Sequence, residues 1–323
     1  SSTPTPFQMF LLGTADPLEG PQALSTSSST ARMWSVKART TAQPGTAGCC
    51  GYDRFAVTSP VNDLIIRGIT SFLADARSSA AFRTRWQEPL LAFADARDPF
   101  FGRLGQWVSP DHAMPQDLLP DAGSVAVYFL PFERDVMRSN RTGGHASDQW
   151  AYAYVETNAL ITSLNVHLTG LLRAHGLNAA GIPPTHNFDQ ERLMSHWSHR
   201  HVAWIAGLGT FGVHRMLITQ RGCCGRLGSL VISGECEPTA RPGYEFCLHR
   251  HGRTCLKCVK KCRAGALQEN SFDRHLCYSI LLENARVHEE KGLADVCGKC
   301  LSAAPCSHTN PARKLAPLHK TDG

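Results

Sequence analysis

The spacing of apolar residues changes near residue 60. Residues 1–58 show no sustained periodicity and are rich in Ser, Thr, Ala, Pro and Gly, a composition that buries little apolar surface. From Val61 onward, Ile65, Ile69 and Phe72 fall on one helical face and predict a helix. We therefore expect an N-terminal extension over residues 1–58 and ordered structure after it.

Further along the chain, the pattern predicts two strands and a long helix. The apolar run 125–130 is rich in strand-forming residues and is closed by Pro131, and a second such run covers residues 228–233. Between these runs, apolar residues recur at helical spacing: Ile161, Leu164, Leu168 and Leu171. Gly176 follows where a left-handed helix C-terminus favours glycine, so we expect a helix over about residues 150–175.

Strands mixed with helices indicate an α/β (α+β) fold. The chain has 323 residues, more than one typical domain. Pro238, Pro242 and Gly243 interrupt the chain just before a cysteine-rich segment, which predicts a domain boundary there. We expect a larger domain over residues 59–243, a small one over residues 244–310 and a tail over residues 311–323.

Composition and charge say little about where the protein acts or what it binds. With 42% hydrophobic residues the chain can bury a substantial core. No apolar run reaches the roughly 18 residues of a membrane-spanning helix, and the N-terminus lacks the order of a secretory signal. We therefore expect a cytoplasmic protein with no membrane partner. The net charge of +6 permits an anionic partner without selecting one.

Cysteines carry the strongest chemical signal, because nine of the 13 lie between Cys236 and Cys306. Clustering in a long chain favours metal ligation over a disulfide scaffold. Eight of the nine have a spacing like that of two-cluster ferredoxins, in which one cysteine of a run ligates the other cluster. On that logic one 4Fe–4S cluster would be held by Cys247, Cys255, Cys258 and Cys306. The second would be held by Cys262, Cys277, Cys297 and Cys300.

Two other interpretations of the cysteines stay open. Paired C-x2-C units are also the commonest spacing of zinc ribbons, and structural disulfides are a second, weaker alternative because nothing indicates an oxidising compartment. Cys262 is followed by Arg263, where a ferredoxin would usually have Pro. The remaining cysteines lie outside the ferredoxin pattern and are left unassigned: Cys49, Cys50, Cys223, Cys224 and Cys236.

A glycine-rich segment forms a second candidate site. Its G-x-G-x-x-G at residues 207–212 would need a parallel βαβ unit and a following acidic residue to bind a dinucleotide, so a nicotinamide cofactor is not favoured. Dense glycines instead let the backbone approach a bulky, flat cofactor closely. The candidate cofactor contacts are Gly207, Gly209, Gly212, His201, Gly225 and Ser229. We expect His196, His199 and His201 to be packed or hydrogen-bonded rather than metal-bound.

The segments LLPDAGSV at 118–125 and SHRHVAWIAGLGTFG at 198–212, followed by the cysteine run, resemble the epoxyqueuosine reductase and reductive dehalogenase superfamily. The resemblance covers roughly residues 85–310. It implies a nitroreductase-like α/β domain that binds cobalamin, followed by a ferredoxin-like domain whose two 4Fe–4S clusters supply electrons to the corrinoid. A D-x-H-x-x-G motif is absent, which implies no histidine ligand on cobalt.

Departures from the family pattern bear on the substrate. Epoxyqueuosine reductases usually carry Asp-Tyr-His at the start of the helix expected here from about residue 150, whereas this chain reads SDQW at 147–150 and stops soon after the cysteine run. We therefore expect a small-molecule or nucleoside-type substrate, with tRNA as the less favoured alternative. The resemblance also implies a low-potential electron donor such as ferredoxin or flavodoxin.

Reduction of a substrate also needs a proton donor. A Tyr or carboxylic acid held near an Arg would serve, and the candidates are Tyr154, Asp148 and Arg226. Each has a purely structural alternative, respectively helix packing, a helix N-terminal cap and a surface contact.

These observations favour a cobalamin-dependent iron–sulfur oxidoreductase. The alternatives are an electron carrier that serves a separate corrinoid protein and a zinc-stabilised nucleic-acid binder.

Overall fold

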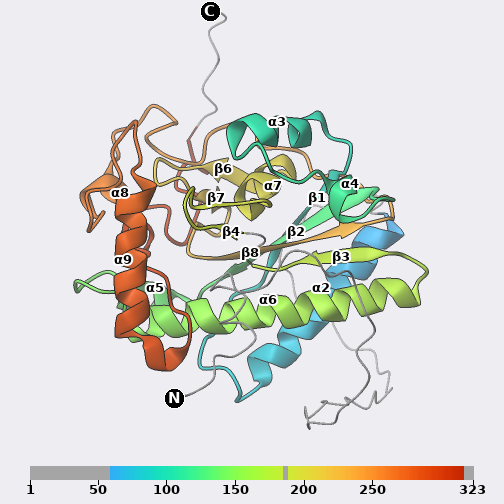
Figure 1. The fold of residues 1–323 in the computed structure, drawn as a ribbon, viewed down its shortest axis with the longest axis horizontal. Helices are drawn as coiled ribbons and strands as arrows, with labels where there is room; N and C mark the ends of the chain where they lie inside the picture. Colours follow the sequence, from blue (N-terminus) through green and yellow to red (C-terminus); the bar gives the residue numbers. More distant parts are fainter. Residues whose placement is uncertain (1–58, 185–187, 316–323) are drawn as a thin grey trace, which may run out of the picture. The chain divides into compact units, whose positions relative to one another are not determined.

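The computed structural model describes residues 59–184 and 188–315 (Figure 1). The extension expected over residues 1–58, with Cys49 and Cys50, lies outside the described residues, as does most of the expected tail. The helices of the described residues are α2 (Pro60–Ser78), α3 (Pro99–Trp107), α4 (Pro115–Leu118), α5 (Arg134–Ser139), α6 (Asp148–Ala174), α7 (His199–Ile205), α8 (Lys257–Lys260), α9 (Arg274–Val287), the 3-10 turn η1 (Glu289–Lys291) and α10 (Lys299–Ser302). The strands are β1 (Leu90–Asp95), β2 (Ser124–Pro131), β3 (Ala179–Ile182), β4 (Phe188–Asp189), β5 (Met194–Ser195), β6 (Gly209–Phe211), β7 (Leu217–Thr219) and β8 (Gly225–Ile232).

A four-stranded sheet in the order β1-β2-β8-β3 forms the centre of the fold. All of its pairs are antiparallel, with Val127 opposite both Ala92 of β1 and Ser229 of β8. The two strands predicted from the sequence, β2 and β8, are therefore neighbours. This arrangement contains no parallel βαβ unit, in agreement with the expectation that the glycine motif is not a dinucleotide site.

Helices cover both faces of this sheet (Figure 1). Helices α6 and α2 pack on one face, where Ala126, Tyr128 and Leu130 of β2 join their core. Helices α7 and α3 lie over the other face, where the alternate residues of the same strand point. Every residue of β2 is buried, which explains why its sequence is continuously apolar instead of alternating. The mixed α/β class predicted from the sequence is confirmed.

Both helices predicted from apolar spacing are present. The pattern of Ile65 and Ile69 lies in α2, and the longer pattern lies in α6. Helix α6 begins at Asp148 because the Ser147 hydroxyl accepts a hydrogen bond from the Trp150 amide at 3.2 Å. It ends before Gly176, whose φ of 75° is the left-handed conformation expected there.

The cysteine-rich part of the chain packs against the beginning of α6. The Ala146 amide donates to Asn284 of α9 at 2.8 Å, and His288 bonds the Ala146 carbonyl at 2.8 Å. The Asn140 side chain donates to the carbonyl of Cys297 at 2.8 Å. Polar contacts therefore join the two expected domains, whose boundary near residue 243 stays a prediction.

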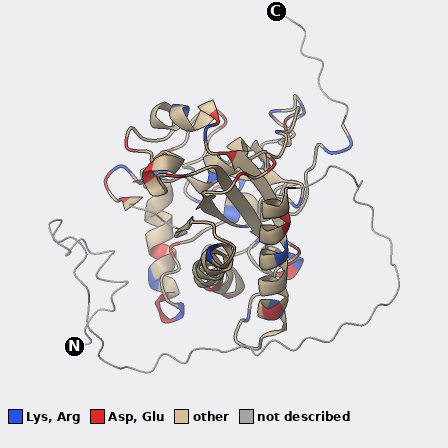
Figure 2. Cartoon of the chain, turned by 90° about the vertical axis from the view of Figure 1, so that its right-hand side faces the viewer, with Lys and Arg blue, Asp and Glu red and all other residues tan. Residues whose placement is uncertain are grey.

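Basic and acidic residues are interspersed along the described helices and loops (Figure 2). The structure contains no helix long and apolar enough to cross a membrane among its described residues.

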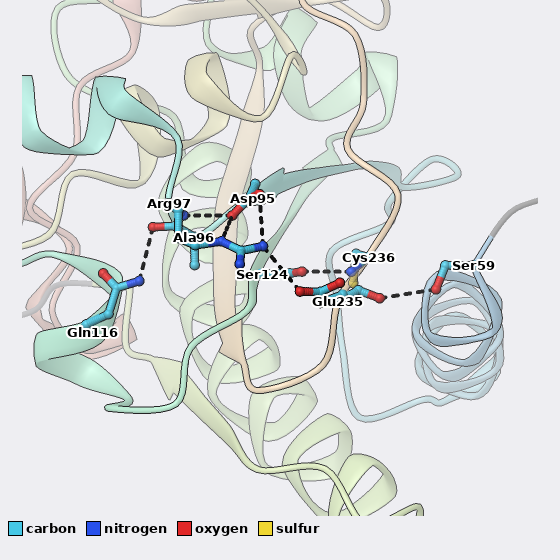
Figure 3. Close-up of polar contacts among 8 residues, drawn as sticks. All are labelled: Ser59, Asp95, Ala96, Arg97, Gln116, Ser124, Glu235 and Cys236. Atoms are coloured by element: carbon cyan, nitrogen blue, oxygen red, sulfur yellow. Dashed lines mark hydrogen bonds and ion pairs between the residues drawn. The ribbon is translucent and has the colours of Figure 1, made fainter.

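One unassigned cysteine, Cys236, belongs to a structural contact after β8 (Figure 3). Its amide donates to Ser124 Oγ at 2.7 Å, and the neighbouring Glu235 accepts from Arg97 at 3.2 Å. Burial raises the pKa of the Cys236 thiol to about 11, so the thiol stays protonated at neutral pH. Cys236 thus helps to hold the segment after β8 against the beginning of β2.

Candidate functional site

The first predicted set of cysteines lies together in space. Burial raises the pKa of the Cys258 thiol to about 11, and repulsion from the neighbouring sulfurs of Cys306, Cys247 and Cys255 adds to the shift. Cys258 lies in α8, Cys247 and Cys255 precede that helix, and Cys306 follows α10. Four thiols from separate segments therefore converge on one place.

The second predicted set also lies together. Burial raises the pKa of Cys277 in α9 to about 11, and the sulfurs of Cys297 and Cys262 contribute after burial. The pKa of Cys300 is raised by burial first and then by Cys297, Cys262 and Cys277, with a smaller contribution from Cys258 of the first set. The two sets are thus neighbours. All cysteines that the structure describes are free, and none forms a disulfide.

Four converging thiols suit a soft metal or an iron–sulfur cluster. Deprotonation of four such buried, mutually repelling thiols is costly, and bound metal removes that cost because thiolates are its ligands. The residues therefore fit the clusters that the spacing implies, with Cys247, Cys255, Cys258 and Cys306 around one group. Among the described residues, no three of these eight sulfurs lie within 4.8 Å of one another, as the tetrahedral thiolates of a single zinc ion would.

Sequence reasoning left Cys223 and Cys224 unassigned, yet both are buried beside the first set. The ligand atoms of His214, Cys223 and Cys306 lie within 4.8 Å of one another. Cys223 has its pKa raised, chiefly by a hydrogen bond with Cys224. The adjacency of two cysteines gave no sign of this position, because it arises from contacts between segments far apart in the chain.

Two predicted catalytic residues, Tyr154 and Arg226, lie against each other. The Arg226 guanidinium carbon is 4.3 Å from the centre of the Tyr154 ring, within the range of a cation–π contact. Burial raises the pKa of Tyr154 to about 12, and Arg226 lowers it in part. The sequence did not indicate a third member, Asp295, whose carboxyl lies close enough to raise the pKa of the tyrosine and whose own pKa is raised by burial.

This buried group has unused hydrogen-bonding capacity. Arg226 Nε and Asp295 Oδ1 are both buried and have no hydrogen-bond partner among the described residues. Buried polar atoms of this kind usually have partners, so the pair could bind a polar group of a ligand.

The third predicted catalytic residue, Asp148, lies in a different environment. Its side chain is 74% exposed and pairs with Lys291 Nζ at 3.0 Å, where hydrogen bonding by that lysine lowers the pKa of the carboxyl. At the first turn of α6 it also complements the helix dipole. Asp148 is not part of the group formed by Tyr154 and Arg226.

The glycines predicted to contact a cofactor are close to other parts of the chain itself. A Cβ on Gly209 would lie 2.0 Å from the Ile218 carbonyl oxygen, and one on Gly212 would lie 2.6 Å from the His214 ring. Similar positions on Gly225 and Gly207 would meet the carbonyls of Leu130 and Ala240 at 2.3 and 2.7 Å. Close packing within the chain accounts for the lack of a side chain at these four positions, and their contact with a corrinoid stays a prediction.

The two remaining predicted cofactor contacts also have partners inside the protein. Ser229 is fully buried, and its hydroxyl contacts Trp197 Nε1 at 2.9 Å and His199 Nδ1 at 3.0 Å. His201 Nδ1 lies 2.7 Å from the Ser198 hydroxyl, and its ring packs 4.9 Å from that of Phe211. His199 and His201 are thus hydrogen-bonded, as expected.

The described residues define an α/β protein with a helix-covered antiparallel sheet and two adjoining groups of four cysteines. No family model matches the sequence, and no curated protein matches it either. Among solved structures, those similar to this chain include an epoxyqueuosine reductase from Streptococcus thermophilus, with a TM-score of 0.48, 16% identity, and coverage of 76% of this chain and 66% of that one.

Two other solved structures give similar values. The epoxyqueuosine reductase of Bacillus subtilis has a TM-score of 0.43 at 17% identity, covering 79% of this chain and 68% of that one. An epoxyqueuosine reductase with a modified tRNA stem loop has a TM-score of 0.44 at 17% identity, covering 75% and 66% respectively. The chain thus spans about two thirds of the length of these neighbours. None of the site residues above is assigned from this similarity.

Proposed function

We propose that this chain is an iron–sulfur oxidoreductase in which each of the two cysteine groups ligates one 4Fe–4S cluster. The observation that carries the proposal is the grouping of the thiols, in which Cys258 adjoins Cys306 while Cys277 adjoins Cys262. These are pairs that a ferredoxin-like exchange of ligands requires. The proximity of Cys300 to Cys258 supports electron transfer between the clusters.

The proposal includes the arrangement that the family resemblance implies. Residues 59–243 would be a nitroreductase-like domain, and residues 244–310 a ferredoxin-like domain that receives electrons from a ferredoxin or flavodoxin. The substrate that finally accepts these electrons would be a small molecule, with tRNA as the less favoured alternative. Low-potential clusters in series deliver single electrons, which suits reduction of a bound substrate.

Tyr154 is the proton donor that we propose for this chemistry. A tyrosine whose pKa is raised to about 12 keeps its proton at neutral pH and releases it only to a strongly basic product of reduction. Arg226 would then stabilise the phenolate over which it lies. Asp148 is left out of this role because its exposed carboxylate is already paired with Lys291.

The resemblance also implies a corrinoid as the immediate electron acceptor. When bound, such a group would supply a metal centre that stores electrons for substrate reduction. The glycines predicted to hold it pack against the chain, so the proposal assigns no residue to it. The same packing favours a second candidate function, that of an electron carrier for a separate corrinoid protein.

Metal content tests the clusters directly. After anaerobic reconstitution we expect about eight irons per chain, two 4Fe–4S clusters, and electron paramagnetic resonance signals on reduction with dithionite. Cys258→Ser and Cys277→Ser should each lose the signal of a different cluster. Cys236→Ser is the matched control, since this buried cysteine belongs to neither group and its backbone hydrogen bond to Ser124 is kept; the iron content should be unchanged.

Zinc in place of iron would contradict the proposal and support the nucleic-acid-binding alternative. Equal loss from both clusters in all three variants would indicate unfolding rather than ligation. Cobalamin added during reconstitution separates the two remaining functions. Retained cobalt at one per chain supports the reductase, and full iron with no cobalt supports the carrier.

A further inference from the structure

A buried histidine contacts one of the proposed cluster ligands. His214 lies in the turn between β6 and β7 and is 6% exposed. Its Nε2 is 3.3 Å from the sulfur of Cys306, a residue 92 positions further along the chain. Gly212 allows the ring to lie there, because a side chain on that residue would overlap the imidazole.

The second ring nitrogen determines which way this hydrogen bond runs. The Met216 amide donates to His214 Nδ1 at 3.1 Å, so Nδ1 is an acceptor and carries no proton. A neutral imidazole then has its proton on Nε2. His214 is therefore the donor, and Cys306 the acceptor, in an N–H···S hydrogen bond.

Cys223 provides a second contact to the same sulfur. Its sulfur, the Cys306 sulfur and a ring nitrogen of His214 lie within 4.8 Å of one another, and its side chain is buried. A metal-bound cysteine is a thiolate with no proton to give, so in this pair only Cys223 can donate.

Backbone hydrogen bonds hold residues 222–224 beside residues 306–307. The Cys223 amide donates to the Cys306 carbonyl at 3.0 Å, and the Cys224 amide donates to the Ser307 carbonyl at 3.0 Å. Gly222, with φ at 82°, permits this approach, because a Cβ there would lie 2.5 Å from the Ser307 carbonyl oxygen. His214 and Cys223 are thus fixed beside Cys306 by the fold itself.

We propose that His214 and Cys223 are positioning residues that raise the reduction potential of the cluster held by Cys247, Cys255, Cys258 and Cys306. This inference rests on the proposed function. Hydrogen bonds to ligand sulfur stabilise the extra negative charge of the reduced cluster. The step concerned is addition of one electron to that cluster, with no proton transferred. The larger domain, which contains His214 and Cys223, would thereby set the reduction potential of a cluster whose four ligands all lie outside that domain.

The test is a redox titration of reconstituted protein, with dithionite as reductant and electron paramagnetic resonance as readout. In His214→Leu, which has no N–H, we expect the ratio of reduced to oxidised cluster at the wild-type midpoint to fall about tenfold, equal to about 59 mV for one electron. His214→Gln keeps a donor and should shift less. Cys223→Ala should add to the effect of His214→Leu, whereas Cys223→Ser, which keeps a hydroxyl donor, should not.

The control is His112→Leu, which removes another buried histidine that bonds Ala113 and Ser198. This variant should leave the midpoint potentials of both clusters unchanged. Full iron content with an unmoved midpoint in both His214→Leu and Cys223→Ala would overturn this inference and leave the proposed function intact. Wild-type protein that binds no iron would overturn the proposed function, and this inference with it.

Discussion

The charge state of His201 is set by its surroundings. Burial lowers the pKa of its imidazole to about 4, and the positive charge of Arg200 and the nearby His112 act in the same direction. An unfolded histidine titrates near 6.5. The folded protein therefore favours the neutral ring, which bonds the Ser198 hydroxyl.

This difference predicts how stability depends on pH. Because the folded pKa is depressed, the stabilisation is present above pH 6.5 and is lost as pH falls toward 4. We expect the free energy of unfolding of the wild type to fall by about 2 to 3 kcal/mol more than that of His201→Gln over this range. Urea unfolding of both proteins at several pH values measures it, and parallel curves would show that His201 is not responsible.

At the scale of single residues, the sequence indicated those whose chemistry depends on local spacing. Because a C-x2-C run places Cys255 and Cys258 within one turn of the chain, this pair of ligands can be predicted from the sequence alone. Asp295 and His214 gave no such signal. Asp295 lies near Tyr154, and His214 near Cys306, only because the fold brings distant segments together. Tertiary proximity of this kind has no signature in residue spacing.

Two glycines illustrate how the surrounding element decides the role of a residue. Gly209 begins β6, where its hydrogen takes the only space left beside the β7 carbonyl of Ile218. Gly170 lies in α6 with nothing within 4 Å of a Cβ position. The first is required by packing, and the second is not.

We therefore expect opposite effects from the same substitution. Gly209→Ala should destabilise the metal-free protein by about 1 to 3 kcal/mol or more, because the strands must separate to admit a methyl group. Gly170→Ala should stabilise it by about 0.5 to 1 kcal/mol through helix propensity. Thermal unfolding without any cofactor measures both. An unchanged stability in Gly209→Ala, with a loss appearing only when cobalamin is present, would restore the interpretation of this glycine as a cofactor contact.

The elements predicted from the sequence were those with the strongest patterns. Strand β2 is buried along its whole length and gives a continuous apolar run, whereas the buried residues of helix α6 recur at helical spacing. Strand β3 has four residues and the pair β4–β5 two each, which is too short for a period to be recognised. The order of strands in the sheet depends on which surfaces fit together, and the chain pattern carries no record of it.

At the scale of the whole molecule, the segment 222–224 connects the sheet to the cysteine-rich part. The segment lies immediately before strand β8, and its Cys223 and Cys224 amides donate to the carbonyls of Cys306 and Ser307. If Cys306 ligates a cluster, loss of that cluster should loosen the segment that pairs with it.

Hydrogen exchange measures this coupling. We expect the amides of Cys223 and Cys224 to exchange about tenfold faster or more after removal of the metal, because their opening free energy falls by at least about 1.4 kcal/mol. The amide of Asp63 in α2, bonded to Ser59 at 3.1 Å, is the comparison and should change little. Equal acceleration of all three would mean that metal removal unfolds the molecule globally.

The sequence separation of the first cysteine group has a consequence for biosynthesis. Cys247 leaves the ribosome well before Cys306, and the partner segment of Cys306, residues 222–224, leaves earlier still. A cluster that uses both cysteines cannot be completed during synthesis of the intervening chain. Three thiols would then wait with one coordination position open, and the order of events in the cell would be synthesis first and cluster completion afterwards.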